Sequence, residues 1–219
     1  MSDTVLILRT CGPNGESYCG FMWPLQVGAT VTAPDWEPTP ECGHGLHGAL
    51  YGEGDGSLLS FDVDAKWLVV EADAASVVNL DGKVKFPSCV VRYVGDRLGA
   101  TTFLAARLPA RVNGYAIIGA TVSAGNGGTA RAGYRGTAQA GDRGTAQAGN
   151  GGTAQAGDWG TAQAGDKGTA QAGDGGIITI RWHDGTRYRI ATGYVGENGI
   201  KPNTPYRCEG GSFVEQGEK

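Results

Sequence analysis

The sequence predicts a mainly all-β protein made of a β-rich N-terminal domain, a short two-sided β-solenoid of octapeptide repeats and a C-terminal β cap. Three observations support this fold class. Short apolar runs alternate with Gly, Pro, Asn and Asp in the first half of the chain, eight-residue units repeat in the second half, and helical periodicity is hard to find anywhere. We place the domain boundaries at 1–110, 111–178 and 179–219.

Short strands joined by tight turns are expected in the first domain. A turn at Asp81-Gly82 should join strands at 76–78 and 83–86, since Asp-Gly tolerates the positive φ angles of a hairpin turn. Residues 34–40 contain three prolines and are predicted to be a loop, because proline cannot enter the interior of a sheet. The clearest strands run from Val5 to Leu8, Lys66 to Glu71 and Cys89 to Val94.

From Ala120 the chain repeats every eight residues around the pattern Gly-Thr-Ala-Gln-Ala-Gly-Asp. Eight residues that include Gly corners are too few to close a coil, so two octads should form one coil with a strand on each side. Seven octads then give three and a half coils. Thr recurs at positions 121, 129, 137, 145, 153, 161 and 169, and Gln at 139, 147, 155, 163 and 171.

The side chains of each Thr-Ala-Gln-Ala strand alternate between two faces. Arg131 occupies a Gln position, and a charge inside so thin a core would be very costly. The alanines, such as Ala130 and Ala132, should therefore point inward. Thr and Gln then form outward ladders with a repeat of roughly 4.8 Å along the solenoid axis.

Apolar residues at both ends of the repeats should seal the solenoid from water. Burial of one Ala contributes on the order of 1 kcal/mol or less, so the ends are expected to matter for stability. Deleting one octad should then displace the C-terminal cap and lower the melting temperature more than deleting two. After the repeats, a hairpin turning at Asp184-Gly185 covers the open edge. The sealing residues are Tyr115, Ile117 and Ile118 upstream, and Ile177, Ile178 and Ile180 downstream.

Charge, cysteine content and hydropathy narrow the class of protein. The formal net charge is only −4, and the basic residues of the repeats are balanced locally by acidic ones, so no nucleic-acid partner is expected. Five scattered cysteines suit reduced thiols better than a secreted disulfide framework. The N-terminal residues lack the pattern of a secretory leader, and no apolar run approaches the length of a membrane span. We therefore expect a cytoplasmic protein with no membrane partner.

The repeat AGYRGTAQAGDRGTAQAG resembles the central repeats of bacterial ice nucleation proteins, whose sixteen-residue coils contain a Thr-rich strand followed by Ala-Gly and a Gly-containing corner. The resemblance covers residues 120–175 and implies a β-solenoid, with ice binding through the Thr ladders as one alternative function. The outward pair here is Thr-x-Gln rather than Thr-x-Thr, and the array is short. We therefore expect feeble ice nucleation.

The segments CGHGLHGALYGEGDGSLL, DGKVKF and RWHDGTRYRIATGYVGENG resemble an uncharacterised family found in bacteriophages, prophages and bacteria. In that family a Cys-Gly-x-Gly-Leu-His domain precedes Gly-Thr-Ala repeats. The resemblance implies a phage or prophage origin and brings no established activity.

The function favoured by the sequence is non-enzymatic binding or assembly through the solenoid surface, with a second copy of the chain (a homo-oligomer) or a host protein as the partner. Trp159 stands at the solvent-facing corner of an octad, and an exposed Trp on a polar, Gly-rich surface indicates a contact. The predicted binding residues are Trp159, Arg143, Thr137, Gln139, Thr145, Gln147, Thr153 and Gln155.

A metal site is an alternative for the segment Cys42, His44 and His47, which places one thiol and two imidazoles within six residues. Zinc takes Cys and His ligands, and a distant cysteine would complete a tetrahedral set. The spacing matches no closed zinc site. We therefore expect no cofactor and no stoichiometric zinc.

An enzyme in the N-terminal domain, with the solenoid as its oligomerisation handle, is the other alternative. A strand ending in Arg9-Thr10 and the later Gly45-Leu46-His47 resemble the nicotinamide-binding strands of ADP-ribosyltransferase-like folds. The catalytic Glu motif of that family is not identifiable, and Glu71 is a candidate only by its position after a strand.

Overall fold

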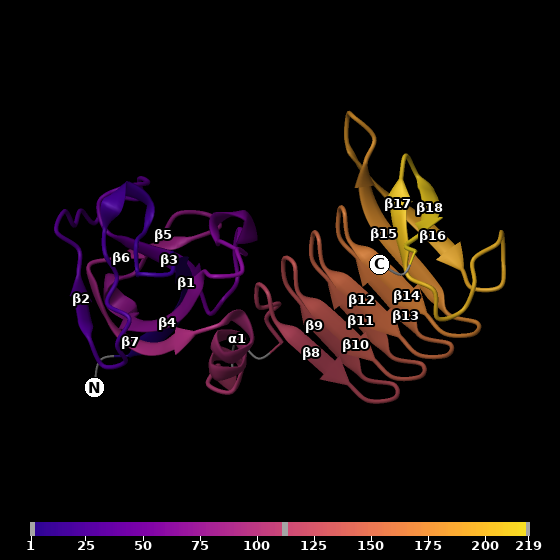
Figure 1. Cartoon of the computed structure of the whole chain (residues 1–219), viewed down its shortest axis with the longest axis horizontal. Coiled ribbons are helices and arrows are strands. Elements are labelled where there is room, and N and C mark those ends of the chain that lie inside the picture. The colour runs from indigo at the N-terminus through magenta and orange to yellow at the C-terminus, as the bar shows by residue number, and fades with distance from the viewer. Residues whose placement is uncertain (1–2, 111–113, 218–219) are drawn as a thin grey trace. The chain divides into compact units, whose positions relative to one another are not determined.

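The computed structural model describes residues 3–110 and 114–217, which divide into two compact units, Met1–Tyr115 and Ala116–Lys219. Both units are built mainly from strands, which confirms the predicted fold class (Figure 1). Within the described residues, no helix has the length and apolar character needed to cross a membrane.

The first unit is formed around one seven-stranded antiparallel sheet with strand order β2-β7-β4-β1-β3-β6-β5. All three strands that the sequence marked most clearly are present, within β1, β4 and β7. Both faces of the central strands are apolar, so Ile7 and Leu8 of β1 are completely buried although they point to opposite sides. The strands are β1 (Thr4–Cys11), β2 (Thr30–Thr32), β3 (Leu46–Leu50), β4 (Lys66–Asp73), β5 (Val78–Asn79), β6 (Val84–Phe86) and β7 (Ser88–Gly95).

One helix, α1 (Arg97–Ala105), is present although helical periodicity was hard to find in the sequence. The Asp96 carboxylate caps this helix by accepting a hydrogen bond from the Gly99 amide at 2.7 Å. Ala100, Thr101 and Leu104 form its buried side. Nine residues with so few buried positions give little periodic signal, which explains the missed helix. Single 3-10 turns lie at η1 (Tyr18–Gly20), η2 (Gly56–Leu58) and η3 (Ala74–Ser76).

The predicted turn at Asp81-Gly82 is confirmed, with φ angles of +56° and +99°. The strand expected just before it, at 76–78, is present but shifted to β5 (Val78–Asn79). The Asp73 carboxylate accepts a hydrogen bond from the Ala75 amide at 3.2 Å and stabilises η3 instead. The strand that pairs with β6 begins only at Val78.

The second unit is a two-sided solenoid whose coils are sixteen residues long, as predicted. Each strand pairs in parallel with the strand two repeats away, so Thr137 lies between Thr121 and Thr153. Odd and even octads form separate sheets, and the first half of β15 completes a fourth coil. The repeat strands are β8 (Thr121–Ala124), β9 (Thr129–Ala132), β10 (Thr137–Ala140), β11 (Thr145–Ala148), β12 (Thr153–Ala156), β13 (Thr161–Ala164) and β14 (Thr169–Ala172), followed by β15 (Ile177–His183).

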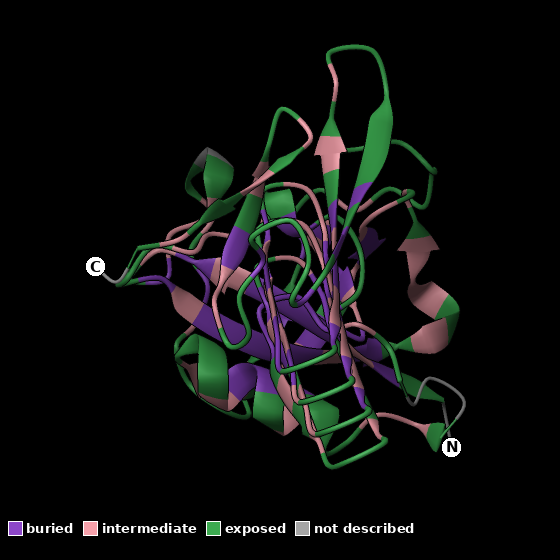
Figure 2. Cartoon of the chain, turned by 90° about the vertical axis from the view of Figure 1, so that its right-hand side faces the viewer, coloured by how far each residue is buried: buried purple, intermediate pink, exposed green. Residues whose placement is uncertain are grey.

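Alanine side chains fill the space between the two sheets, which confirms the predicted inward face. The first Ala of each strand from Ala130 to Ala170 is completely buried (Figure 2). The coils approach so closely that a Cβ atom on Gly144 would lie 3.0 Å from the Gly128 carbonyl oxygen of the preceding coil. Close backbone stacking therefore requires glycine at this corner.

The C-terminal cap shares one hydrophobic core with the repeats. Ile178 and Ile180 point inward and are buried, together with Tyr206. Strand β16 (Tyr188–Tyr194) pairs with β15 through the predicted turn at 184–185, and β17 (Tyr206–Glu209) pairs with β14 and with β18 (Ser212–Glu215). The cap thus adds two strands to the six-stranded sheet β18-β17-β14-β12-β10-β8 and one to the five-stranded sheet β16-β15-β13-β11-β9.

Two of the predicted sealing residues are wrong. Ile177 occupies the outward Thr position opposite Thr161 and is only half-buried. Tyr115 belongs to the first unit, where its ring makes an edge contact with Tyr51 and remains 38% exposed. Ile117 and Ile118 are buried as expected.

Candidate functional site

Two outward surfaces of the solenoid carry the repeated polar side chains. The outward surface of the six-stranded sheet is here named the Thr face. In each of its coils one outward position holds Thr and the other holds Ser or Gln. The opposite surface is less regular, because Arg131 replaces Gln in its first coil and Ile177 replaces Thr in its last. The Thr face consists of Thr121, Thr137, Thr153, Thr169, Ser123, Gln139, Gln155 and Gln171.

The glutamine side chains of the Thr face bond to one another along the solenoid axis. The Gln139 amide nitrogen donates to Gln155 at 2.8 Å, and Gln155 donates to Gln171 at 3.5 Å. These bonds fix the orientation of the amides in a ladder. A comparable bond joins Gln147 to Gln163 at 2.8 Å on the opposite surface.

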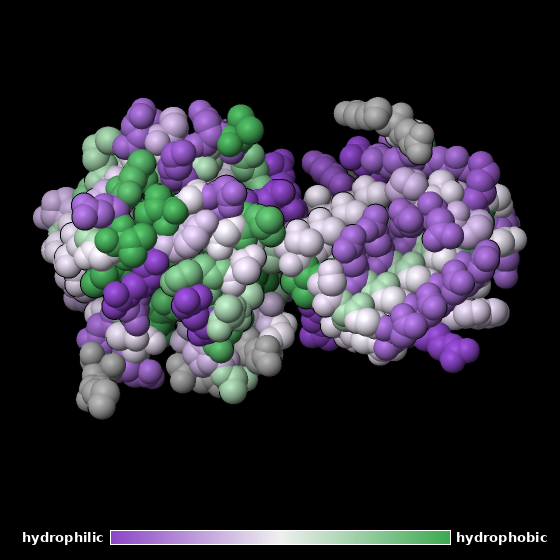
Figure 3. All heavy atoms as spheres, turned by 60° about the horizontal axis from the view of Figure 1, so that its bottom comes forward, coloured by the Kyte–Doolittle hydropathy of each residue, from purple (hydrophilic) through white to green (hydrophobic). Residues whose placement is uncertain are grey.

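The threonine hydroxyls of the Thr face are available to solvent. Those of Thr121, Thr137, Thr153 and Thr169 make no hydrogen bond to any residue in the described part of the chain. β-Branched threonine has few χ1 choices, so its hydroxyl and methyl groups are held in a narrow set of positions. In Figure 3 the solenoid shows parallel rows of hydrophilic residues between rows of near-neutral ones.

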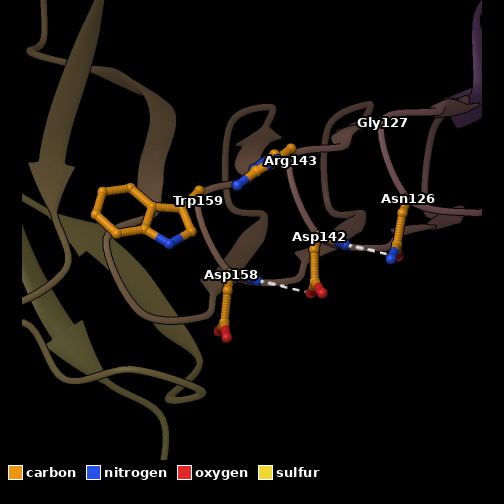
Figure 4. A pocket seen from close by; sticks show the side chains of 6 residues that line it. All are labelled: Asn126, Gly127, Asp142, Arg143, Asp158 and Trp159. Atoms are coloured by element: carbon orange, nitrogen blue, oxygen red, sulfur yellow. Dashed lines mark hydrogen bonds between the residues drawn. The ribbon is translucent and has the colours of Figure 1, made fainter.

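The predicted binding residues do not form one surface. Thr137, Gln139, Thr153 and Gln155 lie on the Thr face. Thr145 and Gln147 lie on the opposite sheet, in β11. Arg143 and Trp159 lie at neither, but at successive corners of one edge (Figure 4). The predicted coil of two octads already implies that alternate octads lie on opposite sheets, and the structure shows this division.

The corner edge has a second ladder, made by backbone amides and carboxylates. The Asp158 amide donates to the Asp142 carboxylate at 3.1 Å, and the Asp142 amide donates to Asn126 at 3.0 Å (Figure 4). Each Asp or Asn therefore stabilises the next coil, which explains its recurrence at this corner. Beside this ladder, a shallow hollow of about 470 Å³ is lined by Asn126, Gly127, Asp142, Arg143, Asp158 and Trp159.

Trp159 is 69% exposed at this edge. Its backbone has φ +57°, in the left-handed region that favours glycine, and its ring packs over Gly175 of the next coil. A Cβ atom on Gly175 would lie 2.7 Å from the indole ring. The indole thus lies against the backbone of the next coil and still presents an exposed aromatic surface.

In the first unit, the segment Cys42, His44 and His47 does not converge on a common point. Lys83 donates to the exposed Cys42 sulfur at 2.9 Å, and this hydrogen bond lowers the pKa of the thiol. His44 lies 3.8 Å from the Asp35 carboxylate. Among the residues that the structure describes, no three His, Cys, Asp or Glu side chains are placed to hold a metal ion.

His47 faces basic rather than metal-ligating neighbours. Burial lowers the pKa of His47, and the charges of Lys83 and Lys85 lower it further. Lys85 is completely buried and donates to the Glu41 carbonyl at 2.8 Å, which anchors the loop that contains Cys42. The sequence signal for these basic neighbours was the alternation Lys83-Val84-Lys85, because Lys85 lies directly opposite His47 and Lys83 lies two residues before Lys85.

The residues of the enzyme alternative are also engaged elsewhere. Arg9 is buried, stacks on the Trp23 ring at 3.6 Å and donates to the His47 carbonyl at 3.2 Å, and burial lowers its pKa to about 10. Glu71 accepts hydrogen bonds from Thr4 at 2.7 Å and Arg92 at 2.5 Å. These bonds lower the pKa of Glu71, so its carboxyl is held ionised in a surface ion pair.

Comparison with known proteins connects the chain to ice nucleation proteins. It is 41% identical to an ice nucleation protein of Pseudomonas syringae over 107 residues, which are 48% of this chain and 9% of that protein. Identity is 40% over 105 residues with one from Pseudomonas fluorescens and 37% over 109 residues with one from Xanthomonas campestris pv. translucens, covering 8% and 7% of those proteins. The chain therefore spans less than a tenth of the length of these relatives. No family model matches the chain, and no solved structure matches it.

The resemblance to ice nucleation proteins is confirmed by these matches, and it extends over more of the chain than the repeats alone. Neither the comparisons nor the fold bear on the resemblance to phage and prophage proteins, so phage origin stays a prediction. The same holds for cytoplasmic location and for a host partner.

Proposed function

We propose that the solenoid is a non-enzymatic binding surface and that its Thr face binds ice. The observation that carries this proposal is the ladder of four threonine hydroxyls in register, none of which has a hydrogen-bond partner among the described residues. Its relatives are named ice nucleation proteins, which supports the choice of ligand.

The spacing of the Thr face suits ordered water. Successive coils of a parallel solenoid are about 4.8 Å apart, close to an oxygen repeat in the lattice of hexagonal ice. A rigid array reduces the entropy lost on binding, since the threonine rotamers and glutamine amides are already fixed. Four rungs extend for only about 15 Å at this spacing, so the face should adsorb to existing ice far better than it nucleates new ice.

The test is an ice-affinity experiment in which a growing ice front either incorporates or excludes the protein. The double variant Thr137→Tyr and Thr153→Tyr places two bulky rings on the Thr face, whose side chains point to solvent. Its matched control, Thr145→Tyr and Thr161→Tyr, makes the same change in β11 and β13. The first variant should lose incorporation into ice while the control keeps it. Exclusion of the unchanged protein, or equal behaviour of both variants, would refute the proposal.

Protein contact at the corner edge is a second candidate, favoured by the exposure of Trp159 beside Arg143. Trp and Arg are the residues most enriched where interfaces concentrate their binding energy. Glycine occupies equivalent corners at Gly127 and Gly175, so the fold does not require a Trp here. If two copies meet at this edge, Trp159 emission should shift to the blue as concentration rises, and Trp159→Gly should remove that shift. Emission that is independent of concentration would exclude contact between copies at this edge.

A further inference from the structure

Strand β16 ends the five-stranded sheet and carries an apolar outward surface. Within the described residues, β15 is its only neighbour in the sheet. Tyr188, Ile190, Thr192 and Tyr194 point outward and are all exposed, Ile190 to 71%. The hairpin of β15 and β16 is exposed along most of its outer surface (Figure 2).

The backbone of β16 has hydrogen-bonding groups directed away from the sheet. The Val195 amide donates to the Gly176 carbonyl at 2.9 Å, so residues 191 and 193 also direct their groups toward β15 by the alternation of antiparallel pairs. The amide and carbonyl groups of Tyr188, Ile190 and Thr192 therefore lie on the free edge.

Three other strands end the two sheets, and each is less suited to pairing. Strands β8, β9 and β18 are four residues long, whereas β16 has seven. Charged residues on an edge strand oppose pairing with another strand. Strand β9 contains Arg131 and strand β18 contains Glu215, and both residues are exposed. The one charge of β16, Arg189, is held by Asp184 of its own hairpin at 2.5 Å.

We propose that β16 pairs antiparallel with β16 of a second copy of this chain, about a two-fold axis at Ala191. This register places Ile190 opposite Thr192 and Tyr188 opposite Tyr194 of the second copy, pairs that stabilise sheets. Arg189 lies opposite glycine, so no like charges meet. The register also brings Arg187 at one end of the strand toward Glu197 just beyond the other end, both of which are exposed.

The dimer joins two five-stranded sheets into one and leaves both Thr faces on the same side, because the axis is perpendicular to the sheet. It would thereby double the area available to a flat ligand. The dimer is inferred from the β16 edge alone, and it does not depend on whether the Thr face binds ice. A single pair of strands buries less than a standard interface, so the association should depend on concentration in the purified protein.

Sedimentation equilibrium of the full chain tests the dimer. The unchanged protein should approach about twice its mass of 22.6 kDa as concentration rises. Ile190→Lys should keep the protein monomeric, since it places two like charges next to the axis. Val214→Lys, on the edge of the other sheet, is a matched control at an exposed residue and should dimerise like the unchanged protein. A chain that is monomeric throughout, or a dimer that survives Ile190→Lys, would overturn the proposal.

Cross-linking tests the register. With the exposed Cys42 changed to Ser, the double variant Ile190→Cys and Thr192→Cys should form an intermolecular disulfide on mild oxidation, because directly opposite residues are close enough to bridge. Ile190→Cys alone should not cross-link. Efficient cross-linking of the single variant would instead centre the axis on Ile190 and refute the axis at Ala191. Both experiments are independent of ice, so they can fail or succeed separately from the ice-affinity test.

Discussion

The two units bury apolar surface in different ways. In the first unit, large side chains such as Phe86, Leu68 and Leu8 are completely buried between varied neighbours. In the solenoid, the completely buried positions between the sheets are alanines until the cap is reached. Burial of a Leu or Phe contributes roughly 1.5–3 kcal/mol, and burial of an Ala far less. The solenoid must therefore gain its stability from stacked backbone hydrogen bonds, side-chain ladders and sealed ends.

The largest expected difference compares one core position in each unit. Phe86→Ala should destabilise the first unit by about 3–5 kcal/mol, because it removes a buried ring and leaves a cavity. Ala154→Gly, at an equally buried position, should cost only about 0.5–1 kcal/mol. Hydrogen exchange resolved by segment measures each unit separately. If Ala154→Gly destabilised the solenoid as much as Phe86→Ala destabilises the first unit, the contrast between the two cores would be false.

The cap should behave like the first unit rather than like the repeats. Ile178→Ala should cost about 2–5 kcal/mol, since Ile178 is completely buried at the end of the alanine core. Its neighbour Ile177 points outward, so Ile177→Ala should change stability by only about 0.5 kcal/mol. Urea unfolding of both variants provides the measurement. Equal costs would mean that the register of β15 is wrong.

A glycine pair isolates the contribution of coil stacking. A Cβ atom on Gly141 would lie 2.8 Å from the Asn126 backbone nitrogen of the preceding coil, whereas a Cβ atom on Gly125, the equivalent position in the first coil, meets nothing within 4 Å. Gly141→Ala should therefore destabilise the solenoid by about 1–3 kcal/mol.

The control Gly125→Ala should be neutral or stabilising by about 0.4–1 kcal/mol, because it only restricts the unfolded chain. Thermal unfolding of the two variants should move in opposite directions. A loss of stability in both would indicate that glycine is needed at this corner for its own conformation.

The sequence was sufficient for the repetitive unit and less so for the first. A period of eight, two Gly corners and Arg131 at a Gln position together determine coil length and inward face. By contrast, α1 depends on the Asp96 cap and on tertiary burial of Leu104, which a nine-residue pattern does not reveal. Ile177 was misassigned although the period of eight places it at the outward Thr position after Thr169, because its apolar side chain was given more weight than its register.

The outward positions of the candidate site were predictable, and so was their division between two sheets, because both follow from a coil of two octads. Thr137 and Thr145 have identical neighbours in the sequence, and only the sixteen-residue register separates them onto opposite sheets. For the Cys42 segment, the sequence predicted no stoichiometric zinc but did not reveal which contacts its side chains make. Its thiol binds Lys83, 41 residues away, so the local grouping of Cys and His did not reflect contacts made in the fold.

The smallest expected effect concerns two deletions, for which the structure revises the expectation drawn from the sequence. Removing residues 144–151 deletes one octad, and removing residues 144–159 deletes two. The cap strands pair only with the last coil, β15 with β13 and β17 with β14, and β16 and β18 pair only with these cap strands. After loss of one octad, the last coil and its cap rotate together to the other side, and each remaining strand finds a near-identical partner. The cap keeps its seal on Ile178 and Ile180.

Both shortened proteins should therefore fold, and the one lacking a single octad should melt slightly above the one lacking two, because it retains more stacked backbone. Their melting temperatures, measured by circular dichroism in the same buffer, should differ by only a few degrees, as expected for about 1 kcal/mol in a domain of this size. A much lower value for the eight-residue deletion would show that the cap recognises one particular sheet. In that case the two sheets would be interchangeable for the Thr-Ala-Gln-Ala strands of the repeats but not for the cap.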